Sequence, residues 1–134
     1  MLGAVDTRIV VETAWRLATL GRAYDAARLP AVLAQLEPRT IAYARTWQEI
    51  DRVRRLSAVV VYHLPIASSF GACLKLALVR YALLRRRGLP VTFHLGLRVE
   101  REGLLGHAWL SLHGRPLWER QDPSAYRETF RFPR

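Results

Sequence analysis

Residues 73–99 read CLKLALVRYALLRRRGLPVTFHLGLRV, and within this stretch the spacing of the apolar residues changes from helical to alternating. The first part, from Gly71 or Ala72 to Arg87, is apolar around most of a helical circumference, which is typical of a buried helix. In residues 91–99 every odd position is apolar, which is typical of a strand with one buried face. We therefore expect a buried helix that leads into a sheet.

The segments before this stretch are expected to be helical. Apolar spacing predicts a helix over residues 6–20, interrupted at Gly21, and prolines fit the first turns of short helices at Pro30 and Pro38. A capping box, Thr46–Glu49, opens a longer helix that ends at Leu64-Pro65. The buried face of that helix is predicted to hold Ile50, Val53, Ser57, Val60 and Val61.

The segments after the stretch are expected to complete an antiparallel sheet. Alternating apolar residues predict strands over residues 107–113 and 116–120, separated by a turn at Gly114. The tail from Gln121 is polar and aromatic, and we expect it to clasp the sheet edge. The predicted fold class is therefore α+β, with N-terminal helices followed by a short antiparallel sheet.

Length and composition are typical of one domain that spans residues 1–134. The 134 residues are 51% hydrophobic, which excludes a disordered tail. We divide them into a helical part, 1–64, and a part with the buried helix and the strands, 65–134. One cysteine excludes an intramolecular disulfide, and four scattered histidines lack the spacing of metal ligands, so neither a metal nor another cofactor is expected.

The longest uncharged segment, Leu56–Leu74, has the length of a membrane span. It contains residues that would break a helix or carry polar groups into lipid, namely His63, Pro65, Ser68, Ser69 and Gly71. We therefore interpret it as a helix end, a turn and a helix start. With no signal peptide at the N-terminus, a cytoplasmic protein without an integral membrane segment is expected.

The formal net charge is +10, and all basic residues except Lys75 are arginines. Such a balance can indicate a nucleic acid, an anionic membrane surface or an acidic peptide as partner. The densest run, residues 85–87, has a local explanation, because cations at the end of a helix offset its dipole. No nucleic-acid-binding motif accompanies the charge, so no nucleic-acid partner is expected.

Cys73 and His107 are the candidates for chemistry. Cys73 falls in the first turn of the buried helix, where unpaired backbone N–H groups favour a thiolate, although a free cysteine is also a common core residue. His107 opens a strand and can face that helix start while an acid on the next strand, Glu119 or Asp122, holds its other nitrogen. A thiol, an imidazole and a carboxylate in this order form an activated nucleophile.

The remaining histidines are expected to have structural places. His63 falls at a helix end, His94 on the polar face of a strand, and His113 in a hairpin turn.

The run from Cys73 to Glu119 resembles the core of the transglutaminase-like leader peptidases of lasso-peptide biosynthesis. The shared features are a Cys-Leu helix that ends in Arg-Gly, a strand with Gly-Leu-Arg, and His-Ala-Trp followed by a hairpin; RIVVETAWRLATL at residues 8–20 is also similar. The resemblance implies a papain-like cysteine peptidase fold, with Cys73 as nucleophile, His107 as general base and acid, and Glu119 as orienting acid. The family usually has aspartate at that last position.

Two departures concern the oxyanion hole. Ser111 replaces the family's common glutamate after His-Ala-Trp, and the segment before the cysteine matches only loosely. Only the backbone N–H of Cys73 is therefore carried over to the oxyanion hole.

The resemblance implies an enzyme that removes the leader from a ribosomally made lasso-peptide precursor. Fused members carry a recognition domain before the peptidase, whereas residues 9–20 here already belong to the helical part, so a separate leader-recognition protein is implied. An ATP-dependent lasso cyclase is implied as a further partner. Two alternatives remain: a transglutaminase-like acyltransferase or amidase with another substrate, and a non-catalytic arginine-rich binding module.

The choice of the orienting acid depends on the hairpin turn. A two-residue turn at His113-Gly114 sets His107 opposite Arg120, and one at Gly114-Arg115 sets it opposite Asp122; both leave Asp122 on the face of His107 and Glu119 off it. A three-residue loop, or a bulge at Gly114, shifts the register by one residue and brings Glu119 onto that face. The family pattern favours Glu119, so we expect the bulged form and keep Asp122 as the alternative.

Overall fold

The computed structural model describes residues 3–23, 29–42, 46–63, 72–120 and 122–134. The helices are α1 (Ala4–Ala23), α2 (Leu29–Leu36), α3 (Trp47–His63) and α4 (Ala72–Arg86). The strands are β1 (Thr92–Glu100), β2 (Gly103–Leu112), β3 (Arg115–Leu117) and β4 (Arg127–Phe132), and a short 3₁₀ helix covers Pro123–Ala125. The predicted α+β class, with helices before an antiparallel sheet, is confirmed.

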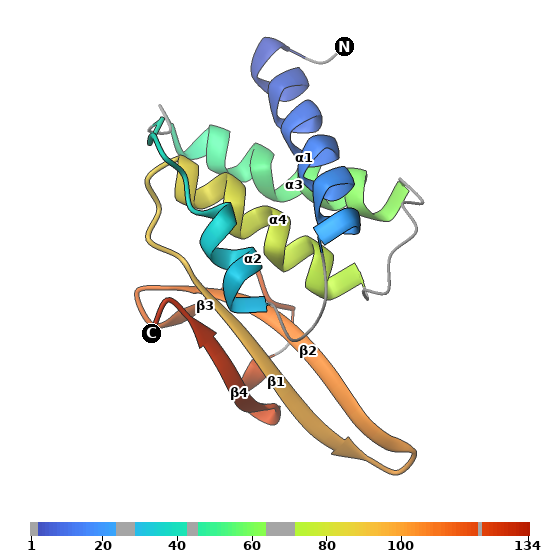
Figure 1. The fold of residues 1–134 in the computed structure, drawn as a ribbon. Coiled ribbons are helices and arrows are strands. Elements are labelled where there is room, and N and C mark those ends of the chain that lie inside the picture. Colours follow the sequence, from blue (N-terminus) through green and yellow to red (C-terminus); the bar gives the residue numbers. More distant parts are fainter. Residues whose placement is uncertain (1–2, 24–28, 43–45, 64–71, 121) are drawn as a thin grey trace.

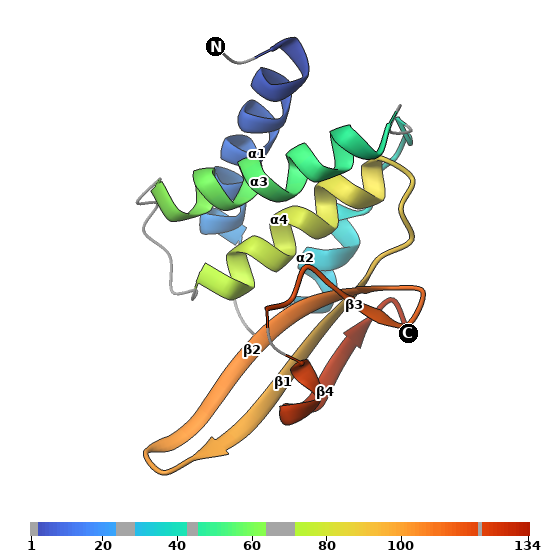
Figure 2. The ribbon, with the colours of Figure 1, turned by 180° about the vertical axis from the view of Figure 1, so that it is seen from behind.

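Helix α4 is the centre of the molecule. Figures 1 and 2 show it between the sheet on one side and α1 and α3 on the other. Its apolar residues therefore meet neighbours around the whole circumference, which explains why the sequence shows so wide an apolar face. The buried residues of α4 are Ala77, Leu78, Val79, Tyr81, Ala82, Leu83 and Leu84.

The helical predictions hold in part. The buried residues of α3 are the five predicted from spacing, and the Glu49 N–H donates to Thr46 Oγ1 at the start of the helix. Helix α1 continues through Gly21, because one glycine costs only about 1 kcal/mol relative to alanine. The described residues after Pro38 are not helical, so that prediction is wrong. The helix end at Leu64-Pro65 and the choice between Gly71 and Ala72 concern residues partly outside the described ranges.

The sheet has the order β3-β2-β1-β4, with antiparallel pairs throughout. The tail beyond Gln121 is more than a clasp, because it supplies β4, an edge strand that pairs with β1 through a register shift between Leu95 and Gly96. In both views the β1–β2 hairpin extends well beyond the helices (Figures 1 and 2). Strand β3 is shorter than predicted and ends at Leu117.

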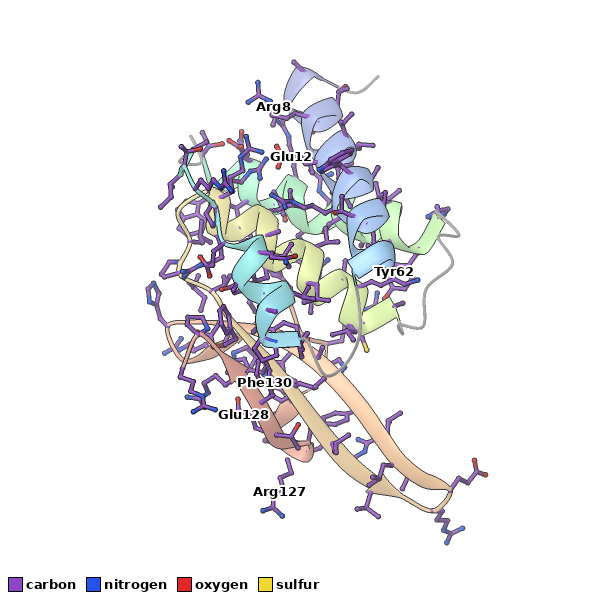
Figure 3. The ribbon with its side chains drawn as sticks, viewed as in Figure 1. Arg8, Glu12, Tyr62, Arg127, Glu128 and Phe130 are labelled. Atoms are coloured by element: carbon purple, nitrogen blue, oxygen red, sulfur yellow. The ribbon has the colours of Figure 1, made fainter. Side chains whose placement is uncertain are left out.

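The arginines at the end of α4 do more than offset a helix dipole. Arg87 is 5% exposed and donates to Glu12 of α1, at 3.3 Å, and to Glu49 of α3, at 3.1 Å. Figure 3 labels Glu12 on α1. Arg85 pairs with Glu37 at 3.1 Å, at the end of α2. These charges connect the helices to one another, a role that a surface run of arginines does not suggest.

In the part of the chain that the structure describes, no helix combines the length and the apolar character needed to cross a bilayer.

Candidate active site

Cys73 lies in the first turn of α4, where the backbone N–H groups have no helical partners. Its side chain is half-buried. A hydrogen bond with His107 is the main cause that lowers the pKa of the thiol from its ordinary value. Partial burial opposes this effect, while the backbone N–H groups of Ala108 and Leu74 add to it. The thiol therefore ionises more readily than an ordinary cysteine.

His107 lies on β2 between the thiol and a carboxylate. Its Nε2 is 3.0 Å from Oε2 of Glu119, which leaves Nδ1 for the sulfur of Cys73. The bonds with Cys73 and then with Glu119 raise the pKa of His107 to about 9, although burial acts in the opposite direction. The arrangement favours a thiolate beside an imidazolium over two neutral groups.

The hairpin between β2 and β3 has a tight, regular turn. Leu112 pairs with Arg115, and the two residues between them, His113 and Gly114, have φ angles of 51° and 79°. Positive φ at both turn residues is the pattern of a type I′ turn, whose twist matches that of the strands. The bulge predicted at Gly114 is therefore wrong.

Glu119 nevertheless faces His107, because the alternation of side chains is broken further along. Strand β3 ends at Leu117, and Trp118 has a φ of 59°, the left-handed region that costs a bulky residue about 1–2 kcal/mol. This single residue turns the chain so that Glu119, rather than Arg120, comes to His107. Asp122 caps the 3₁₀ helix instead, with its Oδ1 accepting the Ser124 N–H at 2.9 Å.

A ladder of rings lies behind His107 on the sheet. His107 is 5.9 Å from Trp109, ring centre to ring centre, and Trp109 stacks on His94 at 5.2 Å with 9° between the planes. Tyr126 lies 5.0 Å from His107 and 6.4 Å from Trp109, so the rings of these three residues form one cluster. These rings fix where the imidazole lies.

The sequence interpretation gave His94 only a place on the polar face of a strand, but the structure buries its side chain among hydrogen-bond partners. It is 7% exposed, its Nε2 is 2.6 Å from Ser111 Oγ, and its Nδ1 bonds Glu128, which Figure 3 labels on β4. Ser111, at the position of the family's common glutamate, thus bonds a histidine that supports Trp109. Local spacing gave no signal for this role, because residues 94, 109 and 111 are seen to share a face only once the register of β1 and β2 is known.

The other two histidines have the predicted places. His63 ends α3, where Nδ1 meets the Val59 carbonyl at 2.8 Å, and His113 is a turn residue. Within the described residues, no group of three or more His, Cys, Asp or Glu side chains could hold a metal ion.

A cleft of about 810 Å³ opens over Cys73, His107 and Glu119. Its walls are α3 and α4 on one side and β2, β3 and the segment after β3 on the other. Tyr62, which Figure 3 labels at the end of α3, is one of the residues that line this cleft. His107 thus contacts both Cys73 and Glu119, and all three residues line the cleft, where a nucleophile, a proton carrier and an orienting acid must be accessible to a substrate. The segment SSFGA before Cys73 lies mostly outside the described residues.

A family model described as the transglutaminase-like superfamily matches residues 7–131 of the chain. That match covers α1 through β4, and so includes every element around the cleft. No curated protein and no solved structure matches the chain.

Proposed function

The chain belongs to the transglutaminase-like superfamily, and from this premise we propose that it is a cysteine peptidase that removes the leader from a ribosomally made lasso-peptide precursor. This superfamily generally contains enzymes of the cysteine-protease type. The observation that carries the proposal is the position of His107, bonded to Cys73 on one side and to Glu119 on the other. The lasso-peptide substrate is supported by the resemblance of residues 73–119.

The proposed reaction starts from the thiolate of Cys73 and the imidazolium of His107. The sulfur attacks the scissile carbonyl carbon, and the negative oxygen that forms is stabilised by the backbone N–H of Cys73 at the start of α4. His107 gives its proton to the leaving amine, and the peptide bond breaks to leave a thioester. A water molecule then loses a proton to His107 and attacks the thioester, which releases the leader carboxylate and the thiolate. Glu119 holds the imidazole throughout.

The proposal is tested with the Cys73→Ala variant. Exchange of a thiol for a methyl removes the nucleophile but little volume, so the variant should keep the melting temperature of the parent within a few degrees and lose leader removal entirely. Cleavage is followed by mass spectrometry of the precursor peptide. A folded variant that cleaves at the parent rate would overturn the peptidase proposal. Transfer of the acyl group to an added amine in preference to water would indicate the acyltransferase alternative.

We further propose, from the resemblance, that a separate leader-recognition protein presents the substrate and that a lasso cyclase consumes the product. The recognition protein should raise the cleavage rate strongly at low micromolar precursor, through apolar contacts with a modest electrostatic contribution. The measurement is cleavage with and without that protein across a salt series. Equal rates would contradict the split arrangement, and a fall of about tenfold in moderate salt would mean that charge dominates the encounter.

A further inference from the structure

The cleft above Cys73 has more positive than negative side chains. Its charged lining consists of four arginines and two carboxylates: Arg54, Arg55, Arg80, Arg120, Asp51 and Glu119. Both carboxylates are already engaged, Glu119 with His107 at 3.0 Å and Asp51 with Arg55 at 3.2 Å. Across the described residues, the other three arginines form no ion pair with a carboxylate.

Arg80 is the most constrained of these three arginines. Its Nε donates to Ser57 Oγ at 3.0 Å, its Nη2 donates to the Arg54 carbonyl at 2.8 Å, and its guanidinium lies 5.1 Å from the ring centre of Trp118. Two of its five N–H donors are thereby used, and the plane is fixed against an aromatic ring. A guanidinium held in this way presents its remaining donors in a fixed direction.

The charge of Arg80 is poorly compensated. Burial, followed by the nearby charge of Arg54, lowers the pKa of Arg80 to about 10. Elsewhere in the molecule, arginines with buried or partly buried side chains form ion pairs with carboxylates, as Arg87 does with Glu12 and Arg85 does with Glu37. The charges of Tyr62 and Glu119 act on the pKa of Arg80 in the opposite direction, but Glu119 is bonded to His107, so no carboxylate of the described residues pairs directly with this partly desolvated cation. A carboxylate that entered the cleft would supply the missing partner.

The position of Arg80 along α4 sets the distance to the nucleophile. Arg80 follows Cys73 by seven residues, which is two helical turns on nearly the same face, or about 10 Å along the axis. An extended peptide advances about 3.3 Å per residue, so a bound residue near Arg80 lies about three positions from the scissile bond. Trp118 connects the surroundings of Arg80 with those of the catalytic candidates. Its ring contacts Arg80, and the next residue in the chain, Glu119, bonds His107.

We propose that Arg80, with Arg54 beside it, binds a carboxylate of the peptide substrate, namely an aspartate or glutamate side chain about three residues from the scissile bond. This inference rests on the proposed peptidase function and names the class of substrate residue that the cleft selects. The fork of Arg80 matches the two oxygens of a carboxylate, and the ring of Trp118 keeps water from one side of the pair.

The test uses acetylated, amidated octapeptides that carry aspartate at one position, each paired with the isosteric asparagine peptide, over a background of small and aliphatic residues. Binding is measured by fluorescence polarisation with the Cys73→Ala chain, and cleavage by mass spectrometry with the parent chain. When the aspartate lies about three residues from the cleaved bond, we expect the aspartate peptide to bind about tenfold more tightly than its asparagine partner. Octapeptides with a free C-terminus distinguish a side-chain carboxylate from a terminal one.

Two variants connect the preference to Arg80. Arg80→Gln should bring the ratio of aspartate to asparagine binding to within about twofold of unity. Arg54→Glu does not alter the side chain of Arg80 and places a competing carboxylate beside it, so it should abolish the preference even if Arg80→Gln fails to fold. The matched controls are Arg8→Gln for Arg80→Gln and Arg8→Glu for Arg54→Glu, which make the same charge changes on an exposed side chain of α1 (Figure 3), a helix that contributes no described residue to the cleft.

Each outcome separates this inference from the proposed function. Equal binding of aspartate and asparagine peptides at every position overturns the subsite, whether or not the parent chain cleaves them. A preference confined to free C-termini overturns the side-chain assignment. An aspartate preference that Arg8→Glu removes as fully as Arg54→Glu does means that net charge, not Arg80, is responsible, and overturns the subsite. An aspartate preference in binding together with Cys73-independent cleavage supports the subsite and overturns the peptidase proposal.

Discussion

At the scale of single residues, the interaction of His107 with Glu119 is the feature on which the proposed chemistry depends. The carboxylate is 3.0 Å from Nε2, and together with Cys73 it keeps the imidazole protonated to a pH of about 9. It also fixes the ring so that the other nitrogen faces the sulfur. Loss of the charge on Glu119 should therefore disturb both the orientation of the ring and the ionisation of His107.

The first prediction concerns the two acids near the end of the hairpin. Glu119→Gln keeps the shape and removes the charge, so kcat/KM for leader removal should fall by roughly a hundredfold or more. Asp122→Asn alters a cap of the 3₁₀ helix and should change kcat/KM by less than about threefold. The two variants are compared in the same cleavage assay with the recognition protein at saturation. A larger loss in Asp122→Asn would assign the orienting role to that residue.

The second prediction concerns pH. Cys73 has a lowered pKa and His107 a pKa raised to about 9, so thiolate and imidazolium coexist above the pKa of the thiol and below about pH 9. Alkylation by iodoacetamide should therefore be fast well below the pH at which an ordinary thiol ionises, about 8.5. Cleavage should decline as the pH rises through about 9, because His107 then lacks the proton for the leaving amine.

The control for the pH prediction is the His107→Ala variant. Removal of the imidazole takes away the main cause of the lowered thiol pKa, so the midpoint of alkylation should move up towards about 8.5. An unchanged midpoint would mean that the start of α4, and not His107, activates the thiol. In Glu119→Gln the basic limb of the cleavage profile should move to lower pH, since the carboxylate supports the imidazolium.

At the scale of secondary-structure elements, the register shift between β1 and β4 determines how β4 pairs with the sheet next to the rings. Leu95 pairs with Phe130 and Gly96 with Glu128, so Thr129 of β4 is the extra residue. Gly96 lies at this shift, and a Cβ there would be 3.0 Å from the Arg127 carbonyl oxygen, from Trp109 Cζ3 and from Tyr126 Cβ. The absence of a side chain allows β4 and the two aromatic residues to approach β1 closely. Trp109 and Tyr126 in turn contact the ring of His107, so the bulge supports the candidate site.

The third prediction is that Gly96→Ala destabilises the protein and impairs cleavage. The new methyl meets backbone and ring atoms that cannot move freely, which should lower the free energy of unfolding by about 1–3 kcal/mol. Displacement of Trp109 should reduce cleavage as well. Urea denaturation and the cleavage assay are the measurements.

Gly106→Ala is the matched control for this substitution. A Cβ at Gly106 would have Leu97 Cδ2 as its nearest neighbour, at 3.7 Å, which is an ordinary contact. Its free energy of unfolding should therefore stay within about 0.5 kcal/mol of the parent value. Equal losses in the two variants would contradict the packing argument at Gly96.

At the scale of the whole molecule, buried charges connect the helical layer. Arg87 follows α4 and contacts Glu12 of α1 and Glu49 of α3, and its side chain is 4% exposed. Loss of Arg87 would remove the ion pair that it forms with each of these two partly buried carboxylates, and breaking such a pair from one side costs far more than the pair contributes as a whole. The fold of the helices around α4 therefore depends on this one guanidinium.

The fourth prediction is that Arg87→Leu lowers the free energy of unfolding by about 3–5 kcal/mol. Addition of Glu12→Gln and Glu49→Gln to that variant should restore part of the loss, because the two carboxylates that lost their pair with Arg87 are then neutral. The control is Arg55→Ala, which breaks the exposed pair with Asp51 and should cost less than about 1 kcal/mol. Denaturation in urea measures all three. A loss for Arg87→Leu no larger than that for Arg55→Ala would show that the cluster is not a structural support.

The sequence alone determined the features that depend on local spacing. Helical periodicity marked α4 as a helix buried on all sides and selected the buried residues of α3, because both follow from the 3.6-residue turn. Alternation in residues 91–99 predicted β1, and the α+β class followed from the order of these patterns. The resemblance of residues 73–119 to a transglutaminase-like peptidase family indicated the superfamily from the sequence alone.

The tertiary structure alone decided which side chains meet. The pairing of β4 with β1 and the burial of His94 depend on register, which a period of two residues leaves open until distant strands pair. The approach of Glu119 to His107 depends on the left-handed backbone of Trp118, and no local propensity favours a tryptophan there. Trp118 adopts this conformation with its ring against Arg80 of α4, a contact between residues far apart in the chain. Contacts of this kind form only when the sheet lies against the helix, so spacing along the chain cannot specify them.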